Sequence, residues 1–510
     1  MRKTASIALG VSALLALSAC TGTGSSGSSS SNASNATLTY GSQADVTTFD
    51  PYLSVNGSTY NYLVPLYDTL IRLGSNGKLE PDLATSWGYA DNGLQFDLTL
   101  RSGVKFSDGT PFNAQAVKVN IERAKKINGP ETAELAGVSS VTAVNPTHAV
   151  INLSIPQPSM TTILSDVLGM MVSPKAIAAG TVATDPVGAG PYVLNKSETT
   201  TGDTYTFTRN KYYWDKSAFP FNTYVVRVIP DENTLYSAFK SGEVDVVGGL
   251  NDQVANAQSA GYQVIKSPVN FSGLFLLDRP GKVVPALGNV KVRQAMNYAV
   301  DRTAIVKAVS PGLGTPTSQW ITPGLPGYVK SLNNYYTYNV PKAKQLMKEA
   351  GYPNGFTLKV QTAPFLGLTT TAQLIGSYLS KIGITLQIDE VSPSDFISDL
   401  ASGRDPAAQF LFGVQDTNLD AHQLITPTAI FNPFHGSDAK LNSILAEAQT
   451  AAPAQRTKLY EQFNERLTQQ AWFLITNFED VTVFANSKVK NVTFWPSRAV
   501  PSIYGWAPAK

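Results

Sequence analysis

Residues 356–390 read FTLKVQTAPFLGLTTTAQLIGSYLSKIGITLQIDE, and this stretch decides the fold. Apolar and polar residues alternate at 356–360 and again at 384–388, which is the pattern of half-buried β-strands. Between them, the apolar residues from Leu374 to Ile382 share one face of a helix, and Gly383 follows as its stop. A strand, a helix and a second strand over about 35 residues form a βαβ unit, which pairs its strands in parallel. The stretch therefore predicts an α/β lobe.

The rest of the body gives the same two kinds of pattern. The length of 510 residues suggests two or three domains. Asp231 is predicted to cap a helix that Gly242 ends. The predicted fold class is α/β with more than one lobe. Further strands are predicted near 94–101, 205–207 and 224–229, and further helices near 292–300, 343–350 and 459–467.

The first residues of the chain have the pattern of an export signal. Arg2 and Lys3 precede an apolar run over 7–17, which at about 11 residues is too short to span a membrane. Residues 17–20 read LSAC and resemble the lipobox of bacterial lipoproteins, in which the cysteine is lipidated after cleavage. We therefore expect a signal peptide at 1–19, a lipidated Cys20, and an extracytoplasmic protein anchored to the cell membrane. The Ser-, Gly- and Asn-rich residues up to 36 are expected to form a flexible tether.

Composition excludes several classes of protein. Cys20 is the only cysteine, so no disulfide within the chain and no thiol catalysis in the body is possible. Without Arg2 and Lys3 the 39 basic residues become 37, which equals the 37 acidic residues. A neutral surface argues against nucleic-acid binding, which requires a basic footprint.

We expect a monomer.

Seven sequence blocks then stand in an order that resembles the extracytoplasmic solute-binding proteins of ABC importers, family 5, the peptide- and nickel-binding type. The blocks occur from about residue 37 to the end of the chain. They are FDP (49–51), LYDTL (66–70), LEPDLATSW (79–87), LRSGVKFSDGTPF (100–112), GAGPY (188–192), RQAMNYA (293–299) and residues 343–352.

The resemblance implies a two-lobed periplasmic-binding-protein clamp of type II, with mixed β-sheets flanked by helices. Two extended segments, expected at 270–277 and 481–485, would join the lobes. The lobes would close on an oligopeptide-like solute and deliver it to the permease subunits of the importer. Aromatic residues make up 10% of the sequence, so an oligosaccharide stacked on aromatic side chains is the alternative solute. The expected parts are lobe I (37–59, 186–270 and 481–510), an extra domain packed on it (60–185) and lobe II (271–480).

The sequence contains no complete motif for a catalytic or metal-binding site. His422 and His435 are 13 residues apart with no partner cysteine, so no zinc site is predicted. Ser437 and Lys440 match a Ser-x-x-Lys motif, but no companion Ser-Asp-Asn or Lys-Thr-Gly element accompanies it. We expect no cofactor, no metal and no enzymatic activity. An enzyme on the same fold and a structural surface lipoprotein are the remaining alternatives.

The resemblance also indicates where a solute would bind. Relatives that bind dipeptides use an aspartate for the ligand amine and an arginine for its carboxylate. Here Gln415 falls at the aspartate position, Asp416 is one residue later, and residues 357–375 contain no arginine. Free dipeptides are therefore expected to bind weakly, because a buried charged terminus without a partner costs several kcal/mol, roughly.

The predicted ligand-binding residues come from both lobes. Each aromatic residue among them can instead belong to the core, and each aspartate to a solvated loop. They are Asn56, Tyr60, Trp320, Phe365, Phe412, Gln415, Asp416 and Asp420.

Overall fold

The computed structural model describes residues 36–54, 57–495 and 498–509. The predicted signal peptide, Cys20 and Asn56 lie outside these residues. Among the described residues, no helix combines the length and the apolar composition that crossing a membrane would require.

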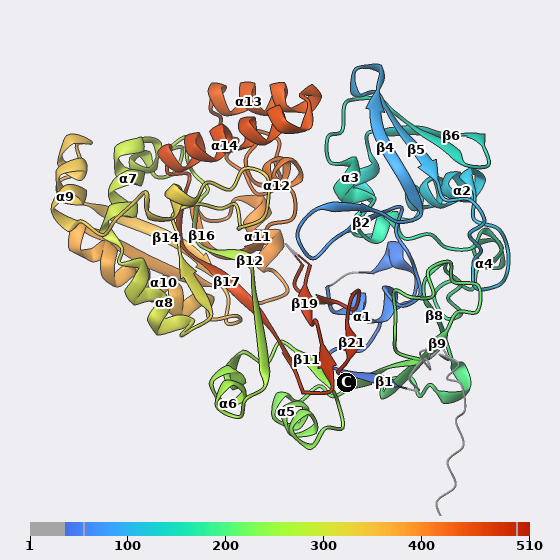
Figure 1. The fold of residues 1–510 in the computed structure, drawn as a ribbon. Coiled ribbons are helices and arrows are strands. Elements are labelled where there is room, and N and C mark those ends of the chain that lie inside the picture. Colours follow the sequence, from blue (N-terminus) through green and yellow to red (C-terminus); the bar gives the residue numbers. More distant parts are fainter. Residues whose placement is uncertain (1–35, 55–56, 496–497, 510) are drawn as a thin grey trace, which may run out of the picture.

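The largest sheet of the described residues is mixed and passes through both halves of the molecule (Figure 1). Its order is β15-β14-β16-β12-β17-β11-β1-β10-β9-β8, and β13 pairs with β17 beside this path. Its strands are β1 (Thr37–Ser42), β8 (Tyr192–Leu194), β9 (Thr204–Arg209), β10 (Thr223–Val228), β11 (Val246–Gly248), β12 (Gln263–Leu276), β13 (Gly314–Pro316), β14 (Phe356–Thr362), β15 (Ile384–Glu390), β16 (Ala407–Gly413) and β17 (Phe473–Ala485).

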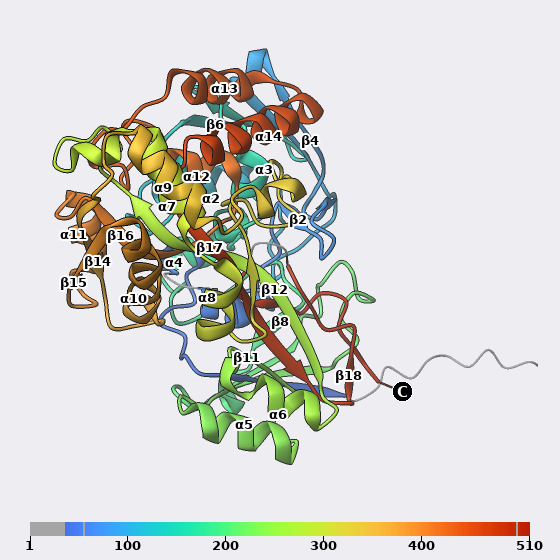
Figure 2. The same ribbon diagram turned by 90° about the vertical axis from the view of Figure 1, so that its left-hand side faces the viewer.

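Two long antiparallel strands connect the halves. β12 and β17 pair along most of their length, from Gln263 opposite Ala485 to Phe275 opposite Phe473 (Figure 2). The register of this pair shifts between Pro268 and Asn270 and again between Ser272 and Gly273. The two segments expected to join the lobes fall in these strands, apart from residue 277, which follows β12.

The predicted βαβ unit is confirmed. β14 and β15 pair in parallel, with Phe356 opposite Ile384, and α10 (Leu368–Leu379) connects them. Gly383 adopts a left-handed conformation with φ of 81°, as expected of the residue that ends the helical segment.

We call lobe II the part formed by β13–β16 and α7–α14. Helices cover both faces of the sheet in this lobe. Alternate residues of β12 point to opposite faces, so the strand contributes apolar side chains to a separate core on each face. Phe271 and Phe275 join the core beneath α12–α14, whereas Leu274 and Leu276 join the core beneath α7, α9 and α10. The helices of this lobe are α7 (Val290–Ala299), α8 (Arg302–Val309), α9 (Val340–Glu349), α10, α11 (Phe396–Ser402), α12 (Thr417–Leu424), α13 (Ala439–Thr450) and α14 (Pro453–Gln469).

We call lobe I the part formed by β1, β8–β11 and the C-terminal strands. β1 lies between β10 and β11 and is parallel to both. Asp231 caps α5 (Glu232–Ser241) by accepting from Thr234 N, and Gly242 ends it, as predicted. The remaining elements are α6 (Val254–Ser259), β18 (Val489–Lys490), β19 (Thr493–Phe494), β20 (Pro501–Ser502) and β21 (Ala507–Pro508).

We call the extra domain the part from α1 to α4. Its antiparallel sheet has the order β4-β5-β7-β6, and α2 packs on it (Figure 1). Its elements are α1 (Tyr60–Leu63), α2 (Ala114–Ala124), α3 (Met160–Ile163), α4 (Pro174–Ala179), β2 (Ile71–Leu73), β3 (Leu79–Pro81), β4 (Ala84–Ala90), β5 (Gln95–Leu100), β6 (Val138–Asn145) and β7 (His148–Leu153).

Short 3₁₀ turns connect these elements. They are η1 (Pro51–Leu53), η2 (Gly57–Thr59), η3 (Asp91–Gly93), η4 (Thr132–Leu135), η5 (Val167–Gly169), η6 (Lys196–Glu198), η7 (Asn251–Gln253), η8 (Pro285–Gly288), η9 (Lys330–Asn334) and η10 (Ser380–Ile382).

A buried aspartate fixes the extra domain to lobe I. The Asp68 carboxylate accepts from Trp214 Nε1 at 2.8 Å, from Tyr504 Oη at 3.1 Å and from Tyr213 Oη at 3.3 Å. Asp68 belongs to the LYDTL block, and Tyr504 belongs to the C-terminal segment. The block is therefore a structural element that holds three distant segments together.

The GAGPY block is structural for a different reason. Gly190 N donates to Leu66 O at 2.9 Å, so the two backbones are in direct contact. A Cβ atom on Gly188 would lie 2.1 Å from Leu66 O, which is too close for any side chain. Only glycine permits this approach.

Candidate functional site

A cavity lies where lobe I, the extra domain and lobe II meet. Its volume is about 240 Å³. Val269 and Asn270 of β12 contribute to its wall, so the strand pair that joins the lobes borders the cavity directly. The described residues around it are Ser54, Gly57, Tyr60, Pro130, Glu131, Val167, Val269, Asn270, Gly413, Gln415, Arg498, Ala499 and Val500.

Arg498 bridges the cavity from the C-terminal segment. Its guanidinium forms an ion pair with Asp166 of the extra domain, and both side chains are buried. Arg498 Nη1 also donates to Gln415 Oε1 of lobe II at 3.2 Å. The guanidinium carbon lies 5.7 Å from the centre of the Tyr60 ring, within range of a cation–π contact. One side chain thus contacts all the parts that surround the cavity.

The loop that carries Gln415 is held by Asp420 of α12. Asp420 Oδ2 accepts from Gln415 N at 2.9 Å and from Asp416 N at 3.0 Å. Burial raises the pKa of Asp420 well above its usual range, although these two amide donors oppose the shift. Asp420 therefore positions the loop from behind, and it borders neither this cavity nor the second one described below.

Asp416 is satisfied by protein groups in this structure. Its Oδ1 accepts from Asn418 N and Leu419 N as the cap of α12, and from Ser159 Oγ of the extra domain at 2.8 Å. Its Oδ2 accepts from Thr162 Oγ1, also at 2.8 Å. These contacts cross between lobe II and the extra domain. They hold the two parts together on one side of the cavity.

A second cavity of about 230 Å³ adjoins the first, between the extra domain and lobe II. Gln415 and Arg498 border both cavities, and Asp416 borders the second. Ligand cavities are usually about 300–1,000 Å³. The two cavities together fall in that range, and the contact between Gln415 and Arg498 divides them.

The predicted aromatic residues lie in different places. Tyr60 borders the first cavity and is 7% exposed, and its hydroxyl has no hydrogen-bond partner in the described part of the chain. Trp320 lies in the core of lobe II, 6.3 Å from the Phe463 ring. Phe412 contacts the Phe271, Phe410 and Phe431 rings, and Phe365 contacts Phe396. None of these last three predicted residues borders either cavity.

Sequence reasoning missed Arg498 and Glu131. Arg498 comes to the cavity because the C-terminal segment returns to it, which local periodicity cannot reveal. One signal was present, since Arg498 is the only charged residue between positions 491 and 509. Glu131 follows Pro130 in a polar loop and has no comparable signal.

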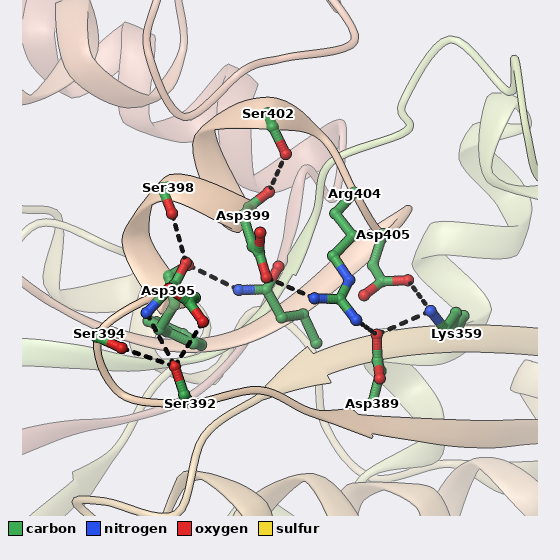
Figure 3. Close-up of polar contacts among 12 residues, drawn as sticks. Lys359, Asp389, Ser392, Ser394, Asp395, Ser398, Asp399, Ser402, Arg404 and Asp405 are labelled. Atoms are coloured by element: carbon green, nitrogen blue, oxygen red, sulfur yellow. Dashed lines mark hydrogen bonds and ion pairs between the residues drawn. The ribbon is translucent and has the colours of Figure 1, made fainter.

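A dense cluster of charges lies on lobe II (Figure 3), and none of its residues borders either cavity. Lys359 Nζ lies 2.8 Å from Asp389 Oδ2 and 2.9 Å from Asp405 Oδ1. Arg404 pairs with Asp389 at 3.2 Å and with Asp399 at 2.6 Å. This cluster joins β14, β15 and α11, and Asp405 Oδ2 is buried there without a hydrogen-bond partner among the described residues. No set of side chains suited to a metal ion occurs among the described residues.

Two lobes joined by paired strands, with a cavity between them, define the class of two-lobed solute-binding proteins. The family comparison agrees: the profile of the bacterial extracellular solute-binding proteins, family 5, middle region, matches residues 78–430, more than half of the chain. The chain belongs to this family, whose members serve ABC importers. The resemblance stated from the sequence blocks is therefore confirmed.

Individual relatives cover nearly the whole chain. The glutathione-binding protein GsiB of Escherichia coli K12 is 28% identical over 477 residues, which is 89% of this chain and 90% of GsiB. The structure of HbpA2 from Haemophilus parasuis is similar with a TM-score of 0.84 and 25% identity, over 93% of this chain and 100% of that one. AgaA from A. tumefaciens R10, solved with agropinic acid, has a TM-score of 0.73 and 26% identity over 93% and 99%.

Proposed function

We propose that this protein is the lipid-anchored, extracytoplasmic binding subunit of an ABC importer for oligopeptide-like solutes. A solute would enter between the open lobes and be enclosed as they close. The closed complex would then deliver it to the permease. The protein would act as a monomer and leave the solute chemically unchanged.

One observation carries the proposal: the first cavity is walled by both lobes and the extra domain and is bridged by Arg498. Closure around a ligand can be driven only by contacts that exist in the closed state and not in the open one. Residues that approach from separate parts supply such contacts. A cavity formed within one lobe would not couple binding to closure.

The solute class is supported by the loop at Gln415 and by the size of the site. The Asp416 carboxylate is occupied by Ser159, Thr162 and the cap of α12, so it is not free for a ligand amine. The first cavity alone is smaller than most ligand sites, and the adjoining cavity supplies the additional length. Both features favour a solute longer than a dipeptide. GsiB, a relative by sequence, is named as a glutathione-binding protein.

A non-peptide solute is the second candidate. AgaA, which is similar to this chain over most of its length, was solved with agropinic acid. An oligosaccharide is the variant suggested by the aromatic content of the sequence. However, the aromatic side chains of Phe365, Phe412 and Trp320 border neither cavity.

Native mass spectrometry of the protein purified from its own host tests the proposal. An intact co-purified peptide supports it, and an intact non-peptide solute supports the second candidate. Products of a bound substrate would indicate an enzyme. Repeated absence of any bound species, with no melting shift across peptide and sugar libraries, would contradict a binding function.

The membrane anchor is tested separately. Cys20→Ser should abolish incorporation of radiolabelled palmitate and release the protein from the membrane fraction. Membrane association that survives this change would contradict lipid anchoring at Cys20, whatever the solute.

A further inference from the structure

Glu131 brings to the first cavity a carboxylate that has no partner among the described residues. It precedes η4 in the extra domain, borders the cavity and is half-buried. In the described part of the chain its carboxylate forms no hydrogen bond and no ion pair. Burial raises its pKa, and the charge of Arg498 opposes that shift. Removing a carboxylate from water without giving it a hydrogen-bond or ion-pair partner costs free energy, so the position of Glu131 requires an explanation.

Arg498 does not supply the missing partner. Apart from Glu131 and Tyr60, Arg498 has the only ionisable side chain among the described residues around the first cavity. Its guanidinium is already paired with Asp166, and the two side chains are only 8% and 5% exposed. Its Nη1 is bonded to Gln415 as well. The charges of Arg498 and Asp166 cancel, and the charge of Glu131 is left over.

The neighbouring Glu134 does not compensate the charge of Glu131 either. Its carboxylate has no partner in the described residues, and burial together with the charge of Glu131 raises its pKa to about 8. At neutral pH Glu134 is therefore mostly protonated and adds little charge. Lobe II contributes Gly413 and Gln415 to the cavity, neither of which carries a charge.

We propose that Glu131 binds a cationic group of the solute, an ammonium or a guanidinium, within the first cavity. A cation placed there would form a charge-assisted hydrogen bond in a site from which closure removes water. An anionic group at the same position would meet an unpaired negative charge. This inference rests on the proposed function, because it assigns one end of the solute bound between the lobes.

A paired peptide mixture tests the inference. The full chain is incubated with a tryptic digest of casein mixed in equal amounts with the same digest after isotopically labelled N-acetylation. Bound peptides are recovered by gel filtration and identified by mass spectrometry. The comparison is confined to peptides without Arg or His, in which acetylation removes every cation. We expect free-amine peptides to be recovered at least tenfold over their acetylated forms.

Glu131→Gln keeps the shape of the side chain and removes its charge, and it should reduce the preference to less than twofold. Glu447→Gln, on the exposed face of α13, is the matched control and should retain the full preference. Equal recovery of both forms by the wild type, or an unchanged preference in Glu131→Gln, would overturn the inference and leave peptide binding intact. Recovery of no peptide at all would overturn both the inference and the oligopeptide proposal.

Discussion

Thr162 Oγ1 of the extra domain donates a 2.8 Å hydrogen bond to Asp416 Oδ2 of lobe II. Asp416 also caps α12 within lobe II. The same carboxylate therefore stabilises a helix in lobe II and forms a contact with the opposite part of the molecule. Only the second of these contacts should be lost when the lobes open.

Thr162→Val should shift the protein toward the open state. A hydrogen bond to a charged group is worth about 1.5–3 kcal/mol, so the ratio of open to closed molecules should rise by roughly tenfold or more. Small-angle scattering of ligand-free protein should then give a larger radius of gyration. Thr161→Val is the control, because Thr161 borders the second cavity without bonding to Asp416. An equal expansion in both variants would mean that the hydrogen bond has no specific role.

Asp420→Ala should lower the free energy of unfolding by about 1–3 kcal/mol, because it leaves two partly buried amide donors without an acceptor. Asp420→Asn keeps an acceptor oxygen and should cost less. Urea unfolding of the three proteins gives the comparison. If the Ala variant is as stable as the wild type, Asp420 does not hold the Gln415 loop.

Asp420→Asn should also change how stability depends on pH. The pKa of Asp420 is raised in the folded protein, so the folded state binds more protons than the unfolded state, whose aspartate pKa is about 3.9. Its contribution to stability is present at low pH and decreases as pH rises toward the folded pKa. Urea unfolding from about pH 5 to about pH 8 should show a shallower decline in the Asn variant. Parallel slopes would show that Asp420 is ionised in the folded protein.

Tyr504→Phe should loosen the C-terminal segment without removing a ring. The variant loses the 3.1 Å bond to Asp68, while stacking on Trp495 and the contact with Arg72 can persist. We expect a loss of about 1–2 kcal/mol in unfolding free energy. We also expect weaker solute binding, because this segment carries Arg498. Unchanged hydrogen exchange over residues 498–509 would contradict the role assigned to Tyr504.

Lys359→Met should destabilise lobe II. It removes the cation that lies between Asp389 and Asp405, and the Asp405 side chain is 0% exposed. Because Lys359 itself is partly exposed, we expect a loss of about 1–3 kcal/mol rather than the full effect of breaking a buried pair. Thermal unfolding of Lys344→Met, a change on the exposed face of α9, should match the wild type.

Free dipeptides should bind weakly or not at all in isothermal calorimetry. Gln415 cannot pair with an ammonium as an aspartate would, and Arg498 is occupied by Asp166 and so cannot serve a free carboxylate. Peptides of four or more residues are the positive control. Tight binding of a dipeptide would show that the second cavity is not needed for recognition.

Local pattern was enough to predict much of the fold. The alternation at residues 356–360 and the capping of α5 by Asp231 depend on neighbours in sequence, and the structure confirms both. Family blocks then gave the arrangement into lobes. The blocks did not locate the site, because they mark structural residues: Asp68 joins segments, and Gly190 permits a close backbone contact.

The candidate site depends on contacts between distant segments. Arg498 meets Asp166 across more than 300 positions of sequence, and no periodicity records that approach. The aromatic residues were ambiguous for another reason. A large aromatic ring can pack in a hydrophobic core as well as against a ligand, and the structure places Trp320 in the core. Gln415 and Tyr60 were predicted from their positions in the family's pattern, outside the seven blocks, and both border the first cavity.

The position of Asn270 offers a way to follow solute binding in real time. It borders the cavity and also follows the irregularity at Pro268 in β12, where the ladder to β17 is interrupted. A bulge is a natural point for a strand to bend. A solute in the cavity would therefore contact β12 directly beside this irregularity. An environment-sensitive fluorophore attached to the outer surface of β12 or β17 would convert this protein into an optical biosensor for its own solute.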